Sequence, residues 1–201
     1  MIKAVIFDFG RVITVQKPTS LFRTYEKELG LSPDTINSIM FESQAWRETL
    51  VGTKTLDEFW HIIGPELGLE SAYEINRFRH RYQAEEAINR GVLDIIHRLY
   101  GQYRLAILSN APAGLWRWLV DWEIGDLFDS VFCSGDEGMA KPDPDVFRVT
   151  LDRLAVSPDE AIFIDDTQRH VEAARRLEIH GIVFTTAEAL RYDFKNLIGE
   201  I

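Results

Sequence analysis

The chain has 201 residues, which is enough for one solid hydrophobic core with a smaller lobe attached. Hydrophobic residues make up 46% and charged residues 27%, the balance of a folded globular protein. The formal net charge of -10 argues against general binding to nucleic acids or anionic membranes, which requires a basic surface, but a few local cations would still admit an anionic small molecule.

The first predicted element is a buried strand at residues 4–7, a continuous apolar run that ends at Asp8. Phe9, Gly10 and Arg11 follow it. A carboxylate at the end of an apolar strand is a candidate for chemistry, although a helix cap or a turn is the commoner role of a single aspartate at such a place.

The segment from residue 16 to residue 90 contains no convincing strand and reads as a bundle of helices. Apolar residues fall on one helix face at Leu21, Phe22, Tyr25 and Leu29, and on another at Phe59, Ile62, Ile63 and Leu67. Helix starts are expected at Ser32-Pro33 and at the capping boxes Thr55/Glu58 and Ser71/Glu74, and helix ends at Gly30 and Gly68. We therefore predict a helical cap over 16–90, inserted into a core made of 1–15 and 91–201.

Strands and helices alternate in the rest of the chain. Apolar runs predict strands at 105–108, 161–164 and 181–184, with a weaker candidate at 130–133, and helical patterns cover 91–100, 113–122, 145–154 and 169–177. This alternation is typical of the α/β class, and we expect a Rossmann-like parallel sheet with helices on both faces.

Targeting signals and disulfides are not expected. Cys133 is the only cysteine, which excludes an internal disulfide. The apolar start of the chain is too short for a signal peptide, and no apolar run approaches the roughly 20 residues of a membrane span. We expect a cytoplasmic protein with neither membranes nor nucleic acids as partners, and the sequence leaves the oligomeric state open.

Polar residues follow each of the strongest strands. Asp8 follows the first, Ser109-Asn110 the second and Asp165-Asp166 a later one, and Lys141 stands in a loop before the helix near 145. In an open parallel sheet such residues meet at the carboxyl edge, where ligands bind. Converging carboxylates call for a cation, and oxygen ligands suit Mg²⁺. The set points to phosphoryl transfer with Asp8 as the nucleophile.

These stretches resemble the four motifs of the haloacid dehalogenase (HAD) superfamily, in its phosphatase-rich branch with a helical cap between the first two motifs. The resemblance rests on four segments in order and spans nearly the whole chain: Phe7-Asp8-Phe9-Gly10, Leu108-Ser109-Asn110, Lys141-Pro142-Asp143-Pro144, and Phe163-Ile164-Asp165-Asp166 with Val171-Glu172-Ala173-Ala174 after it.

The resemblance implies a role for each residue. Asp8 is the nucleophile, Ser109 and Asn110 bind the phosphate, and Lys141 bridges the phosphate and Asp8. The cofactor is Mg²⁺, held by Asp8, the Gly10 carbonyl and Asp166, with Asp165 at or just outside its coordination shell. The partner is a small phosphorylated substrate, with a sugar phosphate as one candidate.

Gly10 departs from the pattern, because phosphatases of this family usually carry a second aspartate there as general acid and base. Such help is worth about 10²- to 10⁴-fold in rate. Arg11 cannot replace it, because a guanidinium does not release its proton near neutrality. His170 could carry protons, but one turn into its helix it is not expected over the leaving group.

Two other functions stay open at this stage. A 2-haloacid dehalogenase also uses an aspartate nucleophile on this fold and needs no metal, but the pair Asp165-Asp166 favours a metal site. A non-catalytic module that binds a phosphorylated ligand is supported only by Gly10.

Four further features are interpreted conservatively. Substrate specificity is expected from the cap, where Trp46, Arg47, Phe59, Trp60 and His61 are candidates. The cluster Trp116–Trp122 is read as core-edge packing rather than a docking patch. The basic run Arg77, Arg79, His80 and Arg81 is read as a solvated helix face, and Cys133 as a small buried apolar residue.

Overall fold

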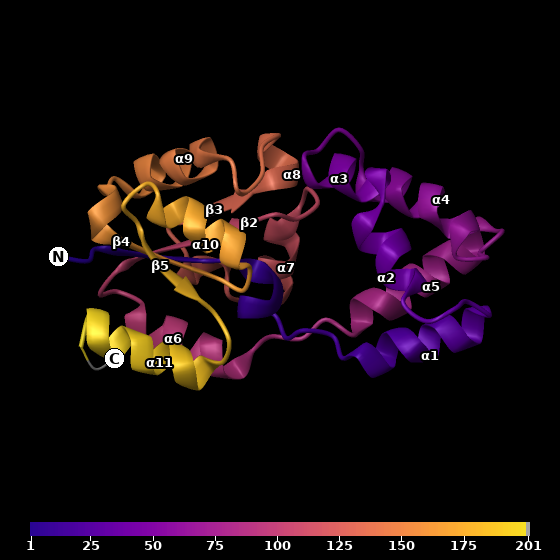
Figure 1. Cartoon of the computed structure of the whole chain (residues 1–201), viewed down its shortest axis with the longest axis horizontal. Coiled ribbons are helices and arrows are strands. Elements are labelled where there is room, and N and C mark those ends of the chain that lie inside the picture. The colour runs from indigo at the N-terminus through magenta and orange to yellow at the C-terminus, as the bar shows by residue number, and fades with distance from the viewer. Residues whose placement is uncertain (200–201) are drawn as a thin grey trace.

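The computed structural model describes residues 1–199 and is built on a five-stranded, fully parallel sheet. The strand order is β3-β2-β1-β4-β5, which places the first strand of the chain at the centre (Figure 1). Every predicted strand is present within one residue of its expected bounds: β1 Ala4–Phe7, β2 Arg104–Ser109, β3 Ser130–Cys133, β4 Ala161–Asp165 and β5 His180–Val183.

Helices cover both faces of the sheet, which confirms the predicted fold class (Figure 1). One face carries α6 (Arg90–Leu99), α7 (Leu115–Asp121) and α11 (Ala187–Leu197). The other carries α9 (Pro144–Leu154) and α10 (Gln168–Arg175), while the short α8 (Ser134–Glu137) follows β3. The sequence patterns did not reveal α11, whose Leu190 and Phe194 are buried in the first of these layers.

Alternate side chains of β1 point to opposite layers, as the geometry of a strand requires. Val5 and Phe7 join the apolar cluster with α6 and α11, whereas Ala4 and Ile6 join the cluster with α9 and α10. Because both faces are covered, all four residues are fully buried and the run carries no polar side chain until Asp8.

The helices after the first strand lie together to one side of the sheet (Figure 1). They have an apolar cluster of their own that includes Tyr25, Ile36 and Phe78. The elements are α1 (Thr19–Leu29), α2 (Thr35–Asn37), η2 (Ser38–Glu42), α3 (Gln44–Leu50), α4 (Leu56–Glu66) and α5 (Ala72–Ala84). We call this group the cap; its expected limits at 16 and 90 remain a prediction.

The local helix signals of the cap are mostly confirmed. Both capping boxes form, and Gly30 ends α1 in the left-handed conformation. The start expected at Ser32 is wrong: α2 begins at Thr35, after a turn in which Asp34 has a φ of 67°. On α4, Ile62 is exposed and does not share the buried face.

Two linkers join the cap to the sheet and run side by side. The Val15 amide donates to the Ala87 carbonyl and the Asn89 amide to the Ile13 carbonyl, both at 2.8 Å. Away from the linkers, Gly52 after α3 lies against Gly135 of α8, where an added Cβ would lie 2.3 Å from the Gly135 carbonyl oxygen. The cap therefore meets the core on two sides of the space between them.

The longest helix, α5, has 13 residues, fewer than the roughly 20 needed to cross a bilayer. None of the helices formed by residues 1–199 has the length and apolar character of a membrane span.

Candidate active site

The sheet topology brings the predicted residues to one edge. β1 pairs with β2 and β4 on either side, with Phe7 opposite both Ile107 and Ile164. The carboxyl ends of these strands are therefore neighbours, and they carry Asp8 just after β1 and Ser109 and Asp165 as the last residues of β2 and β4. Their convergence depends on strand order, because they are far apart in sequence.

Lys141 is the centre of the site. Its Nζ lies 2.9 Å from Asp8 Oδ1 and 2.6 Å from Asp165 Oδ2, and it donates to the Leu108 carbonyl at 2.8 Å. The lysine side chain is buried, so these contacts replace its hydration. Removal of an acid that pairs with a buried ammonium is costly, because it leaves charge without a partner.

The charges in this cluster shift one another's pKa values. Burial raises the pKa of Asp8 to about 6, with the charge of Asp165 adding to the effect and Lys141 opposing it. Burial disfavours the charged form of Lys141, but Asp8 and Asp165 outweigh it and raise the lysine pKa. Asp165 is also buried, yet hydrogen bonding from His170 and the Lys141 ammonium hold its pKa below the usual range. The cluster therefore favours an ionised Asp165 and a charged Lys141.

Asp8 presents its two carboxylate oxygens differently. Oδ1 accepts the Phe9 amide at 2.8 Å and faces Lys141, whereas Oδ2 has no hydrogen-bond donor among residues 1–199. Two partners on one oxygen fix the orientation of the carboxylate, and the second oxygen stays available to attack or to bind a cation.

The two aspartates at the end of β4 make different contacts. Asp165 Oδ1 accepts the Thr167 amide at 2.7 Å, Oδ2 faces Lys141, and His170 Nδ1 lies 3.1 Å from Oδ2. Asp166 is more open, with Thr167 Oγ1 and Arg11 Nη1 at 3.1 and 3.3 Å from its oxygens.

A divalent cation fits this donor set. Asp8, Asp165 and Asp166 each offer an oxygen within 4.8 Å of the others, which suits a hard cation such as Mg²⁺. Asp165 is fully buried and its oxygens already contact Lys141 and Thr167, so they are less available to a cation than those of Asp166. Asp166 is therefore the better direct ligand of the two.

Ser109 and Asn110 take different positions at the end of β2. Ser109 is buried and lies in the cavity wall. The Asn110 side chain donates to the Lys141 carbonyl at 2.9 Å and accepts the Lys141 amide at 2.8 Å. Phosphate binding by Asn110 stays a prediction, and because its side-chain amide is bonded to the Lys141 backbone, the Asn110 main chain is the part left for such a contact.

Gly10 stands in a tight turn, Phe9–Ile13, closed by the Thr14 amide donating to the Phe9 carbonyl at 2.9 Å. Its φ of -66° is open to any residue, and a Cβ built there meets nothing within 4 Å. The residue in the left-handed region is Arg11, with a φ of 61°, whose amide donates to Thr14 Oγ1. Neither backbone strain nor crowding therefore requires glycine at position 10.

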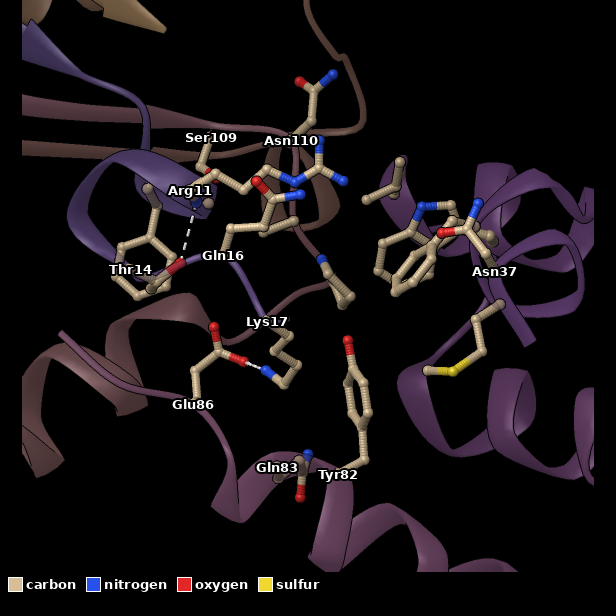
Figure 2. A pocket seen from close by; sticks show the side chains of 18 of the residues that line it. Arg11, Thr14, Gln16, Lys17, Asn37, Tyr82, Gln83, Glu86, Ser109 and Asn110 are labelled. Carbon is tan, nitrogen blue, oxygen red and sulfur yellow. Dashed lines mark hydrogen bonds and ion pairs between the residues drawn. The ribbon is translucent and has the colours of Figure 1, made fainter. Parts of the chain in front are cut away.

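A cavity of about 650 Å³ extends from these residues into the cap. Its wall includes Asp8, Gly10, Lys141 and Asp166 on the core side. Figure 2 shows Ser109, Asn110 and Arg11 on one side of this space, with Asn37 and Tyr82 projecting from the cap. The volume lies in the range of pockets for small organic ligands.

Several residues of the wall were not foreseen. Lys17 and Glu86, one from each linker, form an ion pair across the cavity floor in Figure 2, and Lys17 Nζ lies 4.6 Å above the Tyr82 ring. Nothing in the local sequence links residues 17 and 86. Of the five cap candidates, Trp46, Phe59 and Trp60 line the cavity, whereas Arg47 and His61 do not.

The remaining sequence features are structural. Trp118 and Trp122 pack against the core edge while Trp116 is exposed, and Phe9 stacks on Trp122 at 5.8 Å. Cys133 is buried, and burial raises its pKa to about 11. In the basic run, Arg79 pairs with Asp57 and Arg81 with Glu28 on the cap surface.

The haloacid dehalogenase-like hydrolase family matches residues 2–178. The chain belongs to this family of hydrolases. That assignment confirms the resemblance and identifies the protein as an enzyme.

Two curated relatives align over most of the chain. The sesquiterpene phosphatase astK of Aspergillus oryzae is 28% identical over 202 residues, covering 98% of this chain and 97% of the relative. The D-ribitol-5-phosphate phosphatase of Bacteroides thetaiotaomicron is 27% identical over 185 residues, covering 88% and 89%. Among solved structures, a HAD family enzyme of B. thetaiotaomicron in complex with magnesium and inorganic phosphate has a TM-score of 0.75 at 22% identity, covering 92% of this chain and 96% of that one, and shares the fold.

Proposed function

We propose that this hydrolase is a Mg²⁺-dependent phosphatase that acts on a small phosphorylated metabolite through an aspartyl-phosphate on Asp8. The observation that carries the proposal is the buried Lys141 between Asp8 and Asp165, with Asp166 beside them. The names of the two curated relatives support a phosphate monoester as substrate, and the solved neighbour's magnesium supports the metal.

Asp8, Asp166 and the Gly10 carbonyl would hold the ion, with Asp165 just outside its coordination shell. When bound, the ion screens the repulsion among the carboxylates and polarises a phosphoryl oxygen. Lys141 offsets charge that develops on the phosphoryl group, and Ser109 donates to one of its oxygens.

The reaction is a double displacement at phosphorus. Asp8 Oδ2 attacks the phosphorus atom while the bond to the alcohol oxygen breaks, and that oxygen takes a proton from solvent because Gly10 supplies none. Water then attacks the phosphorus of the aspartyl-phosphate, which releases inorganic phosphate and restores the Asp8 carboxylate.

Turnover of 4-nitrophenyl phosphate tests the proposal. Asp8→Asn should lower kcat by at least about 10³-fold, because an amide cannot act as the nucleophile. Chelation with EDTA should abolish turnover of the wild type, and Mg²⁺ should restore it. Asp152→Asn, which changes an exposed carboxylate on α9, is the matched control and should behave as the wild type.

Three outcomes would contradict the proposal in different ways. Turnover retained by Asp8→Asn rules out this nucleophile, and turnover in EDTA rules out the metal. Metal-independent release of halide from 2-chloropropionate, without phosphate ester hydrolysis, would establish the dehalogenase alternative.

A further inference from the structure

Six aromatic side chains form a closed ring in the cap. Each lies next to the following one with ring centroids 5.2–6.4 Å apart, and the last returns to the first. In order they are Phe22, Phe41, Trp46, Phe59, Trp60 and Tyr82. We call this set the aromatic wall, because all six line the cavity that begins at Asp8.

The aromatic wall is only partly used by the cap's own core. Phe59 and Trp60 are buried, as packing of the cap requires. Phe22, Phe41, Trp46 and Tyr82 pack against that core from its edge, and each keeps part of its surface exposed. Met40, Leu50 and Leu56 line the same space and extend its apolar surface.

The lysines and arginines of the cavity wall each lie beside a carboxylate. Arg23 pairs with Glu26 and with both oxygens of Asp34, at 2.9–3.1 Å. Lys17 pairs with Glu86, and Arg11 with Asp166. In the described part of the wall, each lysine and arginine thus has an acidic partner. The cap offers no spare positive charge for a carboxylate or a second phosphate.

Uncharged polar groups interrupt the apolar surface. Gln16, Asn37 and Gln83 border the cavity, and the hydroxyl of Tyr82 points into it in Figure 2. Such groups can bond one or two oxygen atoms on a ligand.

From these observations we infer that the alcohol part of the substrate is an uncharged group with a largely apolar carbon skeleton, seated against the aromatic wall. The inference rests on the proposed phosphatase activity and names its substrate class. An apolar skeleton gains by leaving water for this surface, whereas a sugar ring would bring several hydroxyls to rings that cannot bond them.

A matched pair of esters tests the inference on the wild type. Cyclohexylmethyl phosphate and glucose 6-phosphate are both phosphates of a CH₂OH group on a six-membered ring, and they differ in the ring oxygen and hydroxyls. We expect kcat/KM for the cyclohexylmethyl ester to exceed that for the sugar ester by about ten- to a hundredfold. The ring oxygens make the sugar the better leaving group, so leaving-group chemistry cannot create this preference.

Variants locate the preference in the aromatic wall. Trp46→Ala and Phe41→Ala should each lower the ratio of the two kcat/KM values by about tenfold, because each removes apolar contact surface from the aromatic wall. Trp116→Ala is the matched control, since Trp116 is exposed and lies outside the cavity wall. It should keep the wild-type ratio.

A preference for glucose 6-phosphate, or a ratio unchanged in both wall variants, would overturn the inference. The wild-type comparison keeps the test valid even if a variant fails to fold. Hydrolysis of 4-nitrophenyl phosphate separates the two proposals. If 4-nitrophenyl phosphate is hydrolysed with Mg²⁺ and glucose 6-phosphate is preferred over the cyclohexylmethyl ester, the substrate class is wrong and the phosphatase activity stands. If none of these esters is hydrolysed, the activity itself is wrong.

Discussion

At the scale of single residues, Gly10 is the most informative position. The cavity wall has open space beside it, and its backbone suits any side chain, so aspartate would fit where related phosphatases carry it. The sequence alone left open whether glycine was required there by its backbone angles. The glycine therefore matters for the reaction and not for the backbone, because position 10 has no acid to protonate the leaving group.

Gly10→Asp should flatten the dependence of kcat/KM on the leaving group's pKa. In the wild type, esters of strongly basic alkoxides should react slowest, because no side chain at position 10 protonates them. An aspartic acid would restore part of the ~10²- to 10⁴-fold contribution of a general acid. A series of aryl and alkyl phosphates measures the two slopes.

Gly10→Asn is the matched control, because asparagine has the same shape and cannot donate a proton as an acid does. It should keep the steep wild-type slope. Equal slopes for wild type and Gly10→Asp would show that another group or a water molecule already protonates the leaving group.

At the scale of elements, the cap is held against the core by two different contacts. The linkers carry paired backbone hydrogen bonds and the Lys17–Glu86 ion pair. The second contact is a close approach of backbones between Gly52, after α3, and Gly135 in α8. Gly135 itself lies tightly against the loop at Pro112 and Ala113, both of which line the cavity.

Gly52→Ala should displace the cap from α8 and lower kcat/KM by roughly ten- to a hundredfold, as small misplacements of binding groups do. The new Cβ would lie 2.3 Å from the Gly135 carbonyl oxygen. Gly68→Ala is a matched control: its φ of +76° resembles the +70° of Gly52, but a Cβ there meets nothing within 4 Å.

Both variants pay the cost of a left-handed alanine, so both should be less stable than the wild type. Only Gly52→Ala should lose activity in the folded state. Activity kept by Gly52→Ala at a temperature where it is folded would mean that this contact does not position the cap.

At the scale of the whole molecule, the burial of Asp8 makes stability depend on pH. Asp8 has a pKa of about 6 in the folded protein, above its ordinary value of 3.8, because burial disfavours its charge. At pH values between these two pKa values, the folded state thus keeps a proton on Asp8 that the unfolded state has released. The contribution of Asp8 to stability therefore falls as pH rises from about 4 to 6.

Asp8→Asn should remove this decline in the metal-free protein. The difference in free energy of unfolding between variant and wild type should grow in the variant's favour from pH 4 to 6 and then level off, by at most ~3 kcal/mol. Urea unfolding in EDTA at several pH values measures it, with Asp152→Asn as the control. A difference that is constant over this range would show that Asp8 does not retain its proton on folding.

The sequence by itself determined the class of fold, and it predicted a set of reactive residues. Continuous apolar runs such as 4–7 and 161–164 can only be buried on both faces, so they predicted a covered parallel sheet and its strands almost to the residue. The capping boxes of α4 and α5 depend on residues only three positions apart, so the sequence predicted them too. It did not predict the start of α2, because the turn at Asp34 overrode the signal at Ser32-Pro33.

Only the tertiary structure decided how those residues are used. Asn110 bonds to the Lys141 backbone and Asp165 contacts the Lys141 ammonium, between residues that lie 31 and 24 positions apart in the chain. The aromatic wall joins rings from five separate cap elements, and no period in the sequence connects them. Local patterns report which face of an element is apolar, whereas a binding surface arises from the angles at which those elements pack.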